Sequence, residues 1–229
     1  MLIVAMIPAR MGSQRLKQKN LQTIGGVPLI TRAIRKCKES GVFDQIWVNS
    51  EHPKFGEIAK EEGVSYHKRP EALGNNQATS EQFILEFLEA HACDYIFQVH
   101  SIAPVLTADG VRVFVNSMLK SDCDVGLSAV NEQIECAMNG RPVNFSFDCK
   151  TNSQELTPVQ RITWSITGWK RSVYLEAARA GKCATYAGKV GIFPVDRMSG
   201  HIIKTEADLR IAEALYADCE RNAFNEALQ

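Results

Sequence analysis

The sequence predicts an α/β fold in which helices cover both faces of a mostly parallel sheet. Apolar runs typical of buried strands alternate along the chain with segments whose apolar residues recur at helical spacing. Residues that favour helix ends lie where this helical spacing begins and stops. A chain of 229 residues, 45% of them hydrophobic, is long enough to bury one substantial core. We therefore expect a single domain over residues 1–229.

The N-terminal segment predicts a strand–helix–strand unit. The apolar run Leu2–Ile7 is typical of a buried strand. A helix follows, because Pro28 suits a first helical position and Gly41 suits a helix end. Its apolar face consists of Leu29, Ile30, Ala33, Ile34 and Cys37. The next strand is expected at Gln45–Ser50, which completes the unit.

The same alternation continues towards the C-terminus. The further expected strands are Val64–Tyr66, Asp94–Val99, Val125–Val130 and a strand near Val190–Pro194. The further expected helices are one ending at Gly63, one beginning at Thr79 or Ser80, one capped by Thr107, one around Ser172–Gly181, and one from Thr205 to about Glu220. Strands and helices in this order imply a Rossmann-like sheet with helices on both faces.

The alternation breaks between Asn131 and Gln160. Glycine, proline and asparagine residues there separate short β-like pieces such as Val143–Phe147. We expect a β-hairpin excursion near residues 131–165, whose exposed strands offer a surface for pairing. A flexible surface loop is the alternative that segment length leaves open.

Composition restricts the partners. The 26 basic and 26 acidic residues cancel, so no global field attracts nucleic acid or an anionic membrane, and any basic site is local. The substrate is therefore expected to be a small molecule.

Cysteine usage and hydropathy suggest a location. The seven cysteines are odd in number, dispersed and without a Cys-x-x-Cys pair, which favours reduced thiols over a disulfide framework or a zinc site. The N-terminal apolar run of six residues is too short for a signal peptide or a membrane span. We expect a soluble, cytoplasmic protein that does not enter a membrane.

The loop after the first strand is the most informative segment. It contains Gly12 and four cations, which are Arg10, Arg15, Lys17 and Lys19. A buried parallel strand that ends in a glycine-containing turn leaves backbone N–H groups unpaired, and the cations add positive charge beside them. The loop is therefore a candidate phosphate site, with a solvated basic loop as the alternative. Its spacing matches neither a Walker loop nor a dinucleotide fingerprint.

Polar residues follow several of the expected strands. Open parallel sheets bind ligands at the carboxyl ends of their strands. The first loop, Asn49–Glu51, His100–Pro104 and the approach to the last helix at His201–Thr205 all belong to that edge. Their convergence in one crevice favours a binding function for the first loop.

At these residues the chain resembles a known family. Pro8-Ala9-Arg10-x-Gly12-Ser13, followed by Lys19-Asn20, is similar to the opening signature of the cytidylyltransferases that make CMP-sialic acid and related CMP-sugars. Arg69-Pro70-Glu71, Pro104-x-x-Thr107 and Thr205-Glu206-x-Asp208-Leu209 follow in the family's order. The resemblance spans most of the chain and weakens between about residues 131 and 170. It implies a nucleotide-diphospho-sugar transferase type of fold and a homodimer that uses the excursion.

The resemblance also implies a reaction. The anomeric hydroxyl of a 2-keto sugar acid of sialic, legionaminic or pseudaminic type attacks the α-phosphate of CTP, giving a CMP-sugar and pyrophosphate. Cations that meet the developing charge dominate such catalysis, so Arg10 and Lys19 are the first catalytic candidates. The implied nucleotide-binding residues are Ala9, Arg10, Gly12, Ser13, Lys19, Asn20, Arg69, Ser80 and His100.

Several of these residues have simpler explanations. Arg15 and Lys17 lie where the family varies and fit a surface role better. A salt bridge accounts equally for Arg69, and a neighbouring backbone group accounts equally for His100, which stands where the family usually has glutamine. Helix capping explains at least one of the hydroxyls at Thr79 and Ser80.

The chain departs from the family at the metal site. Relatives hold magnesium with an Asp-x-Asp before the last helix, but here these positions are Ile202 and Lys204. Mg²⁺ bound to CTP is still expected, held by the triphosphate or by one of the weak candidates Asp196, Glu206 and Asp208. We hypothesise that the Lys204 ammonium replaces the metal as a fixed cation, which makes it a third catalytic candidate. A solvated lysine beside the helix is the alternative.

A second departure concerns the acceptor side. Relatives show an Asn-Gly-Ala run where this chain has Thr163–Trp169, so the acceptor is open, and Trp164 or Trp169 either lines a sugar pocket or belongs to the core.

Two rival functions remain. One is a nucleotide-binding protein that has lost catalysis with its metal ligands, and the other is a cytidylyltransferase for an octulosonate or a phosphonate.

Overall fold

The computed structural model describes residues 1–226 of the chain and the side chains of residues 1–219. Within this part, one seven-stranded sheet has the order β11–β7–β10–β6–β1–β4–β5. Its strands are β1 (Ile3–Pro8), β4 (Gln45–Ser50), β5 (Ser65–Lys68), β6 (Tyr95–Val99), β7 (Val125–Glu132), β10 (Val159–Lys170) and β11 (Val190–Pro194). β10 runs antiparallel to β6 and β7, and the other neighbouring pairs are parallel. The predicted α/β class is confirmed.

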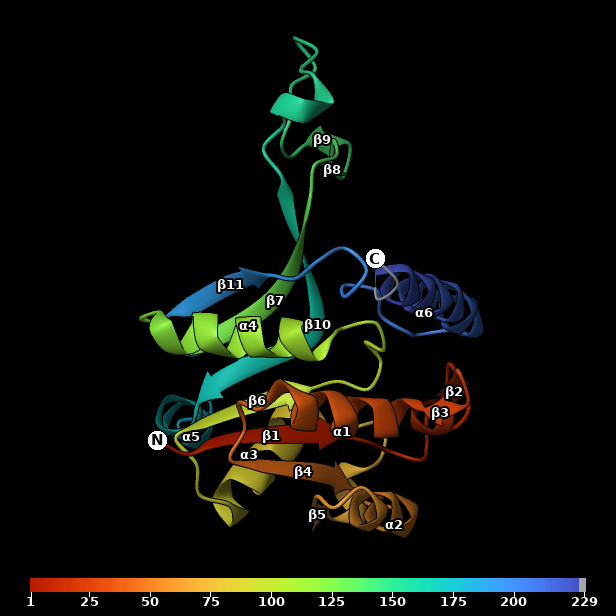
Figure 1. Ribbon diagram of the computed structural model, residues 1–229. Coiled ribbons are helices and arrows are strands. Elements are labelled where there is room, and N and C mark those ends of the chain that lie inside the picture. Colours follow the sequence, from red (N-terminus) through yellow and green to blue (C-terminus); the bar gives the residue numbers. More distant parts are fainter. Residues whose placement is uncertain (227–229) are drawn as a thin grey trace.

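Helices pack on both faces of this sheet (Figure 1). One core contains residues of α1 (Leu29–Ser40), α2 (Pro53–Glu61) and α4 (Ala108–Lys120), and the other contains residues of α3 (Ser80–Ala90) and α5 (Arg171–Arg179). β1 serves both cores, because successive side chains of a strand point to opposite faces. Ala5 and Ile7 belong to the first core, whereas Val4 and Met6 belong to the second.

The last helix, α6 (Glu206–Glu226), contacts the small hairpin of β2 (Thr23–Ile24) and β3 (Val27–Pro28). It begins one residue later than predicted and continues past the predicted end at Glu220. A third apolar cluster joins Ile24 and Leu29 to Ile203 and Leu209. This cluster brings the C-terminal segment beside the loop that follows β1. Among the described helices, none combines the length and the apolar character needed to cross a membrane.

The helix ends follow the predicted chemistry. The Thr79 hydroxyl accepts from Gln82 N and the Gln82 side chain accepts from Thr79 N, which completes a capping box at α3. The Thr107 hydroxyl caps α4 through Gly110 N at 3.0 Å. Gly41 ends α1 with φ 67°, a left-handed conformation that glycine adopts without steric cost. Pro28 lies one position before the helix rather than inside it.

An arm projects from the domain beyond the ends of β7 and β10 (Figure 1). It carries the hairpin of β8 (Ala137–Met138) and β9 (Arg141–Pro142), so a hairpin excursion is confirmed. The prediction of a β-like piece at Val143–Phe147 is wrong, because the hairpin lies just before these residues. Asn139 and Gly140 have φ of 52° and 75°, which is the geometry of a tight two-residue hairpin turn.

A bulge interrupts β10 near the sheet's crevice edge. Pairing with β7 shifts between Ile162 and Thr167, and Trp164 has φ 58°. Hydroxyl groups replace missing ladder bonds, since the buried Ser128 hydroxyl accepts from Ile166 N at 3.2 Å. The bulge turns Thr163 and Trp164 towards a surface pocket.

Candidate active site

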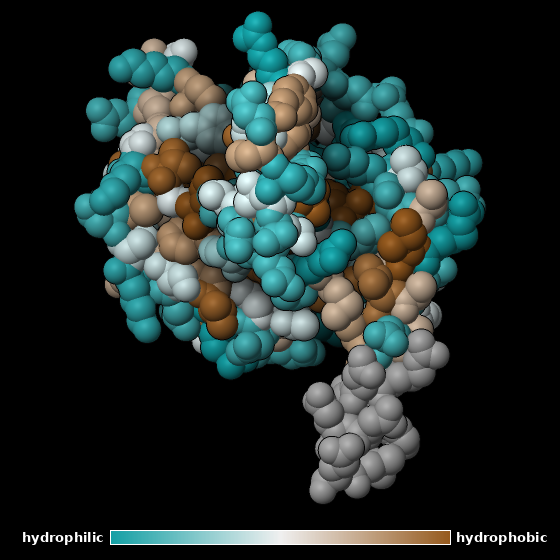
Figure 2. Space-filling model, turned by 90° about the horizontal axis from the view of Figure 1, so that it is seen from above, coloured by the Kyte–Doolittle hydropathy of each residue, from teal (hydrophilic) through white to brown (hydrophobic). Residues whose placement is uncertain are grey.

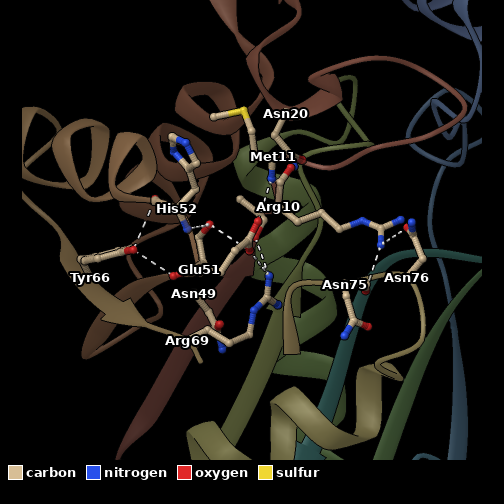
Figure 3. Close-up of polar contacts among 12 residues, drawn as sticks. Arg10, Met11, Asn20, Asn49, Glu51, His52, Tyr66, Arg69, Asn75 and Asn76 are labelled. Atoms are coloured by element: carbon tan, nitrogen blue, oxygen red, sulfur yellow. Dashed lines mark hydrogen bonds and ion pairs between the residues drawn. The ribbon is translucent and has the colours of Figure 1, made fainter. Parts of the chain in front are cut away.

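Three of the predicted site residues, Arg10, Asn20 and Arg69, meet at the loop between β1 and the short helix η1 (Lys19–Leu21) (Figure 3). The loop leaves the carboxyl edge of the sheet between the ends of β4 and β6, which flank β1. Ala9 N donates to Asn49 O at 3.0 Å, so the loop begins as a continuation of the parallel pairing. The loop therefore lies at the carboxyl edge of the sheet, as the strand order predicts.

Glu51 and Arg69 hold the first residues of the loop from below (Figure 3). One Glu51 oxygen accepts from Met11 N at 2.9 Å, and the other accepts from Arg69 Nη2 at 2.8 Å. Arg69 Nη2 also donates to Ala9 O at 2.8 Å. Burial alone would raise the pKa of Glu51, but the bonds from Arg69 and Met11 lower it overall, so Glu51 is ionised at neutral pH.

Arg69 consequently has a structural position rather than an open one. Its side chain is 3% exposed, and its guanidinium lies over the ring of Phe83 at 4.8 Å. Both backbone polar groups of Ala9 are also engaged within the protein. Arg69 and Ala9, which the sequence predicts to bind the nucleotide, therefore stabilise the loop through contacts within the protein.

Asn20 joins the loop to the turn after β6. Its side-chain amide donates to Arg10 O at 3.0 Å, and its carbonyl oxygen accepts from the Ser101 hydroxyl at 2.7 Å. Asn20 is 6% exposed. Together with Arg69 and Glu51 it fixes the backbone of three consecutive residues, Ala9 to Met11, before any ligand arrives. Such preorganisation lowers the entropy cost of binding.

Arg10 extends from the loop towards the segment before α3 (Figure 3). Its guanidinium donates to the Asn76 side chain at 2.9 Å and to Asn75 O at 3.4 Å. Both partners are neutral, so the full positive charge of Arg10 remains available to an anion. Gly12 and Ser13 follow in the same loop; Gly12 is exposed, and a Cβ there would meet no atom within 4 Å.

Lys19 stands at the centre of the cations. Burial, and then the charges of Arg15 and Arg10, lower its pKa to about 8; Lys204 adds to this effect and Asp208 opposes it. Its ammonium donates to Ile203 O at 3.3 Å. The first loop and the segment before α6, distant in sequence, therefore meet at Lys19. Three predicted catalytic residues, Arg10, Lys19 and Lys204, share one electrostatic environment.

His100 ends β6 on the same edge. Its backbone N–H donates to Ser165 O at 3.1 Å. Burial, and secondarily the Lys19 charge, lower the pKa of His100 to about 4. The imidazole is therefore neutral at pH 7 and offers one donor and one acceptor.

The sequence leaves open which of Thr79 and Ser80 caps α3. Thr79 is the helix cap, whereas Ser80 is the exposed first residue of α3. Capping therefore explains Thr79, and the hydroxyl of Ser80 is exposed.

A pocket of about 820 Å³ opens at the base of the arm, beside Lys204. Trp164 lines it, whereas Trp169 is 1% exposed and belongs to the core. The charged or ionisable residues of the lining are Glu132, Arg161, Arg197, His201, Lys204 and Asp208. Glu132 is bonded to Arg161 at 2.8 Å, so Arg197 and Lys204 supply the pocket's exposed positive charge.

Two of the acidic residues that the sequence offers as weak magnesium candidates accept hydrogen bonds within the protein. Asp208 accepts from Lys204 N, Thr205 N and the Thr205 hydroxyl at the start of α6. Asp196 accepts from Met198 N, Ser199 N and the Ser199 hydroxyl within its own turn. No group of three or more His, Cys, Asp and Glu side chains within the described residues has a metal-binding arrangement.

The sequence places Glu51 and Ser101 at the binding edge, within Asn49–Glu51 and His100–Pro104, but predicts no individual role for them or for Lys36. Glu51 had a signal, because a carboxylate directly after a parallel strand belongs to the binding edge. Lys36 lies seven residues after Leu29 and three after Ala33, so helical spacing places it beside the buried face. The bond from Ser101 to Asn20 has no local signal, since the two residues are 81 positions apart.

Comparisons with known proteins agree with this geometry. Residues 4–164 match the family model described as cytidylyltransferase. N-acylneuraminate cytidylyltransferase A of Danio rerio is 30% identical over 167 residues, which span 71% of this chain and 38% of that protein. Pseudaminic acid cytidylyltransferase of Campylobacter jejuni subsp. jejuni is 24% identical over 234 residues, spanning 96% of this chain and 99% of that protein.

A solved structure shares the fold. CMP:2-keto-3-deoxy-manno-octonic acid synthetase, complexed with CTP, superposes with a TM-score of 0.71 at 19% identity, over 95% of this chain and 99% of the other. The match to the family model covers well over half of the chain and confirms the resemblance drawn from the first loop. The chain belongs to the cytidylyltransferase family.

Proposed function

We propose that this chain transfers CMP from CTP to a sugar acid and releases pyrophosphate. The observation that carries the proposal is the convergence of Arg10, Arg15 and Lys204 on Lys19, beside a pocket large enough for a sugar. Cations in this arrangement neutralise a triphosphate and the charge that develops on it during transfer. The two relatives described above carry cytidylyltransferase names and act, by those names, on sugar acids.

The proposed reaction forms a bond between the acceptor's anomeric oxygen and the α-phosphorus. The bond from that phosphorus to the bridging oxygen breaks, pyrophosphate leaves with the electron pair, and the hydroxyl proton passes to water. Arg10 and Lys19 bind the triphosphate, and backbone or hydroxyl groups of Gly12, Ser13 and Ser80 complete its contacts. Asn20 and the neutral His100 lie on the nucleoside side.

Lys204 supplies the fixed cation in this proposal. It is exposed and lies where its charge already acts on Lys19. Asp196 and Asp208 each accept backbone and hydroxyl hydrogen bonds, so magnesium would enter with the triphosphate and be held mainly by its phosphate oxygens.

The pocket at the base of the arm receives the acceptor. Its exposed Arg197 and Lys204 favour an anionic ligand, which fits the carboxylate of a 2-keto sugar acid of sialic, legionaminic or pseudaminic type. Trp164 offers an aromatic wall for a sugar ring. An octulosonate or phosphonate acceptor would use the same charges, and product identification distinguishes these cases.

A homodimer is part of the same proposal. Large apolar side chains lie exposed on the arm, with Ile134, Met138, Val143 and Phe147 between 52% and 73% exposed. Seen from above, brown apolar groups surround the arm on this face of the molecule (Figure 2). A second copy of the chain is the partner that we propose to cover them.

Product analysis tests the proposed function. The protein is incubated with CTP, magnesium and a panel of 2-keto sugar acids, and the mixture is examined by mass spectrometry for the mass of a CMP-sugar. Lys19→Met is the matched negative control, because it removes the central ammonium. Calorimetric binding of CTP without any CMP-sugar across the panel would instead support a nucleotide-binding protein that has lost catalysis.

A further inference from the structure

Lys36 is a buried ammonium to which the proposed reaction assigns no role. It lies on α1, and its side chain is 6% exposed. Nζ donates to Ala103 O at 2.6 Å and approaches Pro104 O at 3.5 Å. Burial lowers the pKa of Lys36 to about 7; Arg32 adds to this effect, whereas Cys37 and Glu39 oppose it. A lysine at this depth is costly unless its ammonium serves the structure around it.

The two carbonyls belong to the turn after β6, residues 100–106. This turn has few bonds of its own, since Ala103 N to His100 O and Leu106 N to Ala103 O are both 3.3 Å long. Pro104 contributes no N–H. The Lys36 ammonium, which carries three donors, therefore provides the shortest bond to the interior of the turn.

The same turn contacts both halves of the candidate site. Its Ser101 hydroxyl donates to Asn20, which holds the first loop. Its Ile102 O accepts from Ile203 N at 2.9 Å, directly before Lys204. Ile203 O in turn accepts from Lys19. A shift of the turn would move the first loop and the Lys204 segment relative to each other.

We propose that Lys36 is a positioning residue, whose ammonium fixes the 100–106 turn through Ala103 and Pro104 and thereby aligns Lys19 with Lys204. The proposal rests on the proposed function only for its consequence in CTP binding. Lys36 itself lies beneath the turn, and its bonds are to the turn's carbonyls. A purely apolar side chain would fill the same space without the cost of burying a charge, but it would leave the Ala103 carbonyl with only the 3.3 Å bond from Leu106 N.

Hydrogen exchange of the ligand-free protein tests the anchoring. Lys36→Met is compared with Lys38→Met, a matched control on the same helix whose lysine donates to the Glu62 carbonyl at the surface. We expect exchange in residues 100–106 and at Ile203 to accelerate at least about tenfold in Lys36→Met, because a hydrogen bond to a charged group is lost. Exchange there should not change in Lys38→Met.

Calorimetry tests the functional consequence. At a temperature where circular dichroism shows all variants folded, Lys36→Met should weaken CTP binding at least about tenfold. Lys36→Gln, which keeps a shorter neutral donor, should fall between Lys36→Met and the wild type. It also serves as the second test where Lys36→Met does not fold. A merely structural role predicts that affinity in the folded fraction is unchanged.

Two results would overturn the inference. One is unchanged exchange of the turn in both Lys36 variants, and the other is unchanged CTP affinity in folded Lys36→Met. A wild-type chain that binds no CTP would contradict the proposed function instead, and the exchange measurement would still decide whether Lys36 anchors the turn.

Discussion

We expect Lys19 to make CTP binding depend on pH. With a pKa of about 8, its ammonium loses charge as pH rises through 8, whereas bound phosphate would raise that pKa. Binding near pH 8 should therefore take up a proton, and affinity should fall by up to about tenfold per pH unit above 8. Calorimetry at pH 7 and 9, in buffers of different ionisation heat, measures both effects. Lys19→Arg stays charged and should lose this dependence; an equal dependence in both proteins would assign it to another group.

We expect Lys204 to supply the fixed cation that takes the place of a metal held by the protein. Lys204→Ala should reduce turnover by about 10²-fold, comparable to losing one preorganised group that stabilises the transition state. Lys204→Asp should make the residual activity depend more steeply on magnesium, because it restores a carboxylate. Lys17→Ala, which removes an exposed lysine of the first loop, is the control for steady-state kinetics. Full activity of Lys204→Ala would contradict the hypothesis that Lys204 acts as a fixed cation.

At the scale of elements, two adjacent hydroxyls at the start of α3 are expected to differ in role. Thr79 caps the helix, and we propose that Ser80 contacts the nucleotide. Thr79→Ala removes the capping box and should lower the free energy of unfolding by about 1 kcal/mol, with CTP affinity kept. Ser80→Ala should show the reverse pattern, with stability kept and affinity reduced. Urea unfolding and calorimetry measure the two properties. Unchanged affinity in Ser80→Ala would remove that residue from the site.

The elements could be predicted from sequence wherever local chemistry determines them. The 3.6-residue spacing, Thr107 and Gly41 located α1 and α4 correctly, because caps and apolar faces are local signals. The arm was predicted, but its hairpin was placed too late, since the Asn139–Gly140 turn was not used as the signal. Elements that depend on long-range pairing, such as the bulge in β10, had no local signature.

The candidate site is likewise predictable from the sequence only where its residues lie close together in the chain. Its cations and glycine lie in one continuous loop, so the sequence identified them together. Arg69 was different: its bonds to Ala9 and Glu51 come from residues 60 and 18 positions away, and only the folded chain shows that it supports the loop. Lys36 was missed for a related reason, because a helix lysine is usually solvated.

At the scale of the whole molecule, the exposed apolar side chains of the arm predict that the protein forms a homodimer. Exposed apolar side chains on a projecting segment are unfavourable in water, so a second copy should cover them. We expect sedimentation equilibrium to give the mass of a dimer. Phe147→Ser should shift it towards the monomer with the helical content unchanged, and Val113→Ser, at an exposed apolar position of α4, should not. A monomeric wild-type protein would contradict this part of the account.

The central claim is that the crevice at the carboxyl edge of the sheet performs nucleotidyl transfer. Pyrophosphate release from CTP, measured with a panel of 2-keto sugar acids and with or without magnesium, tests it most directly. The account predicts release that requires both an acceptor and CTP, and that is abolished in Lys19→Met. The absence of release with every acceptor, from a protein that binds CTP tightly, would contradict it.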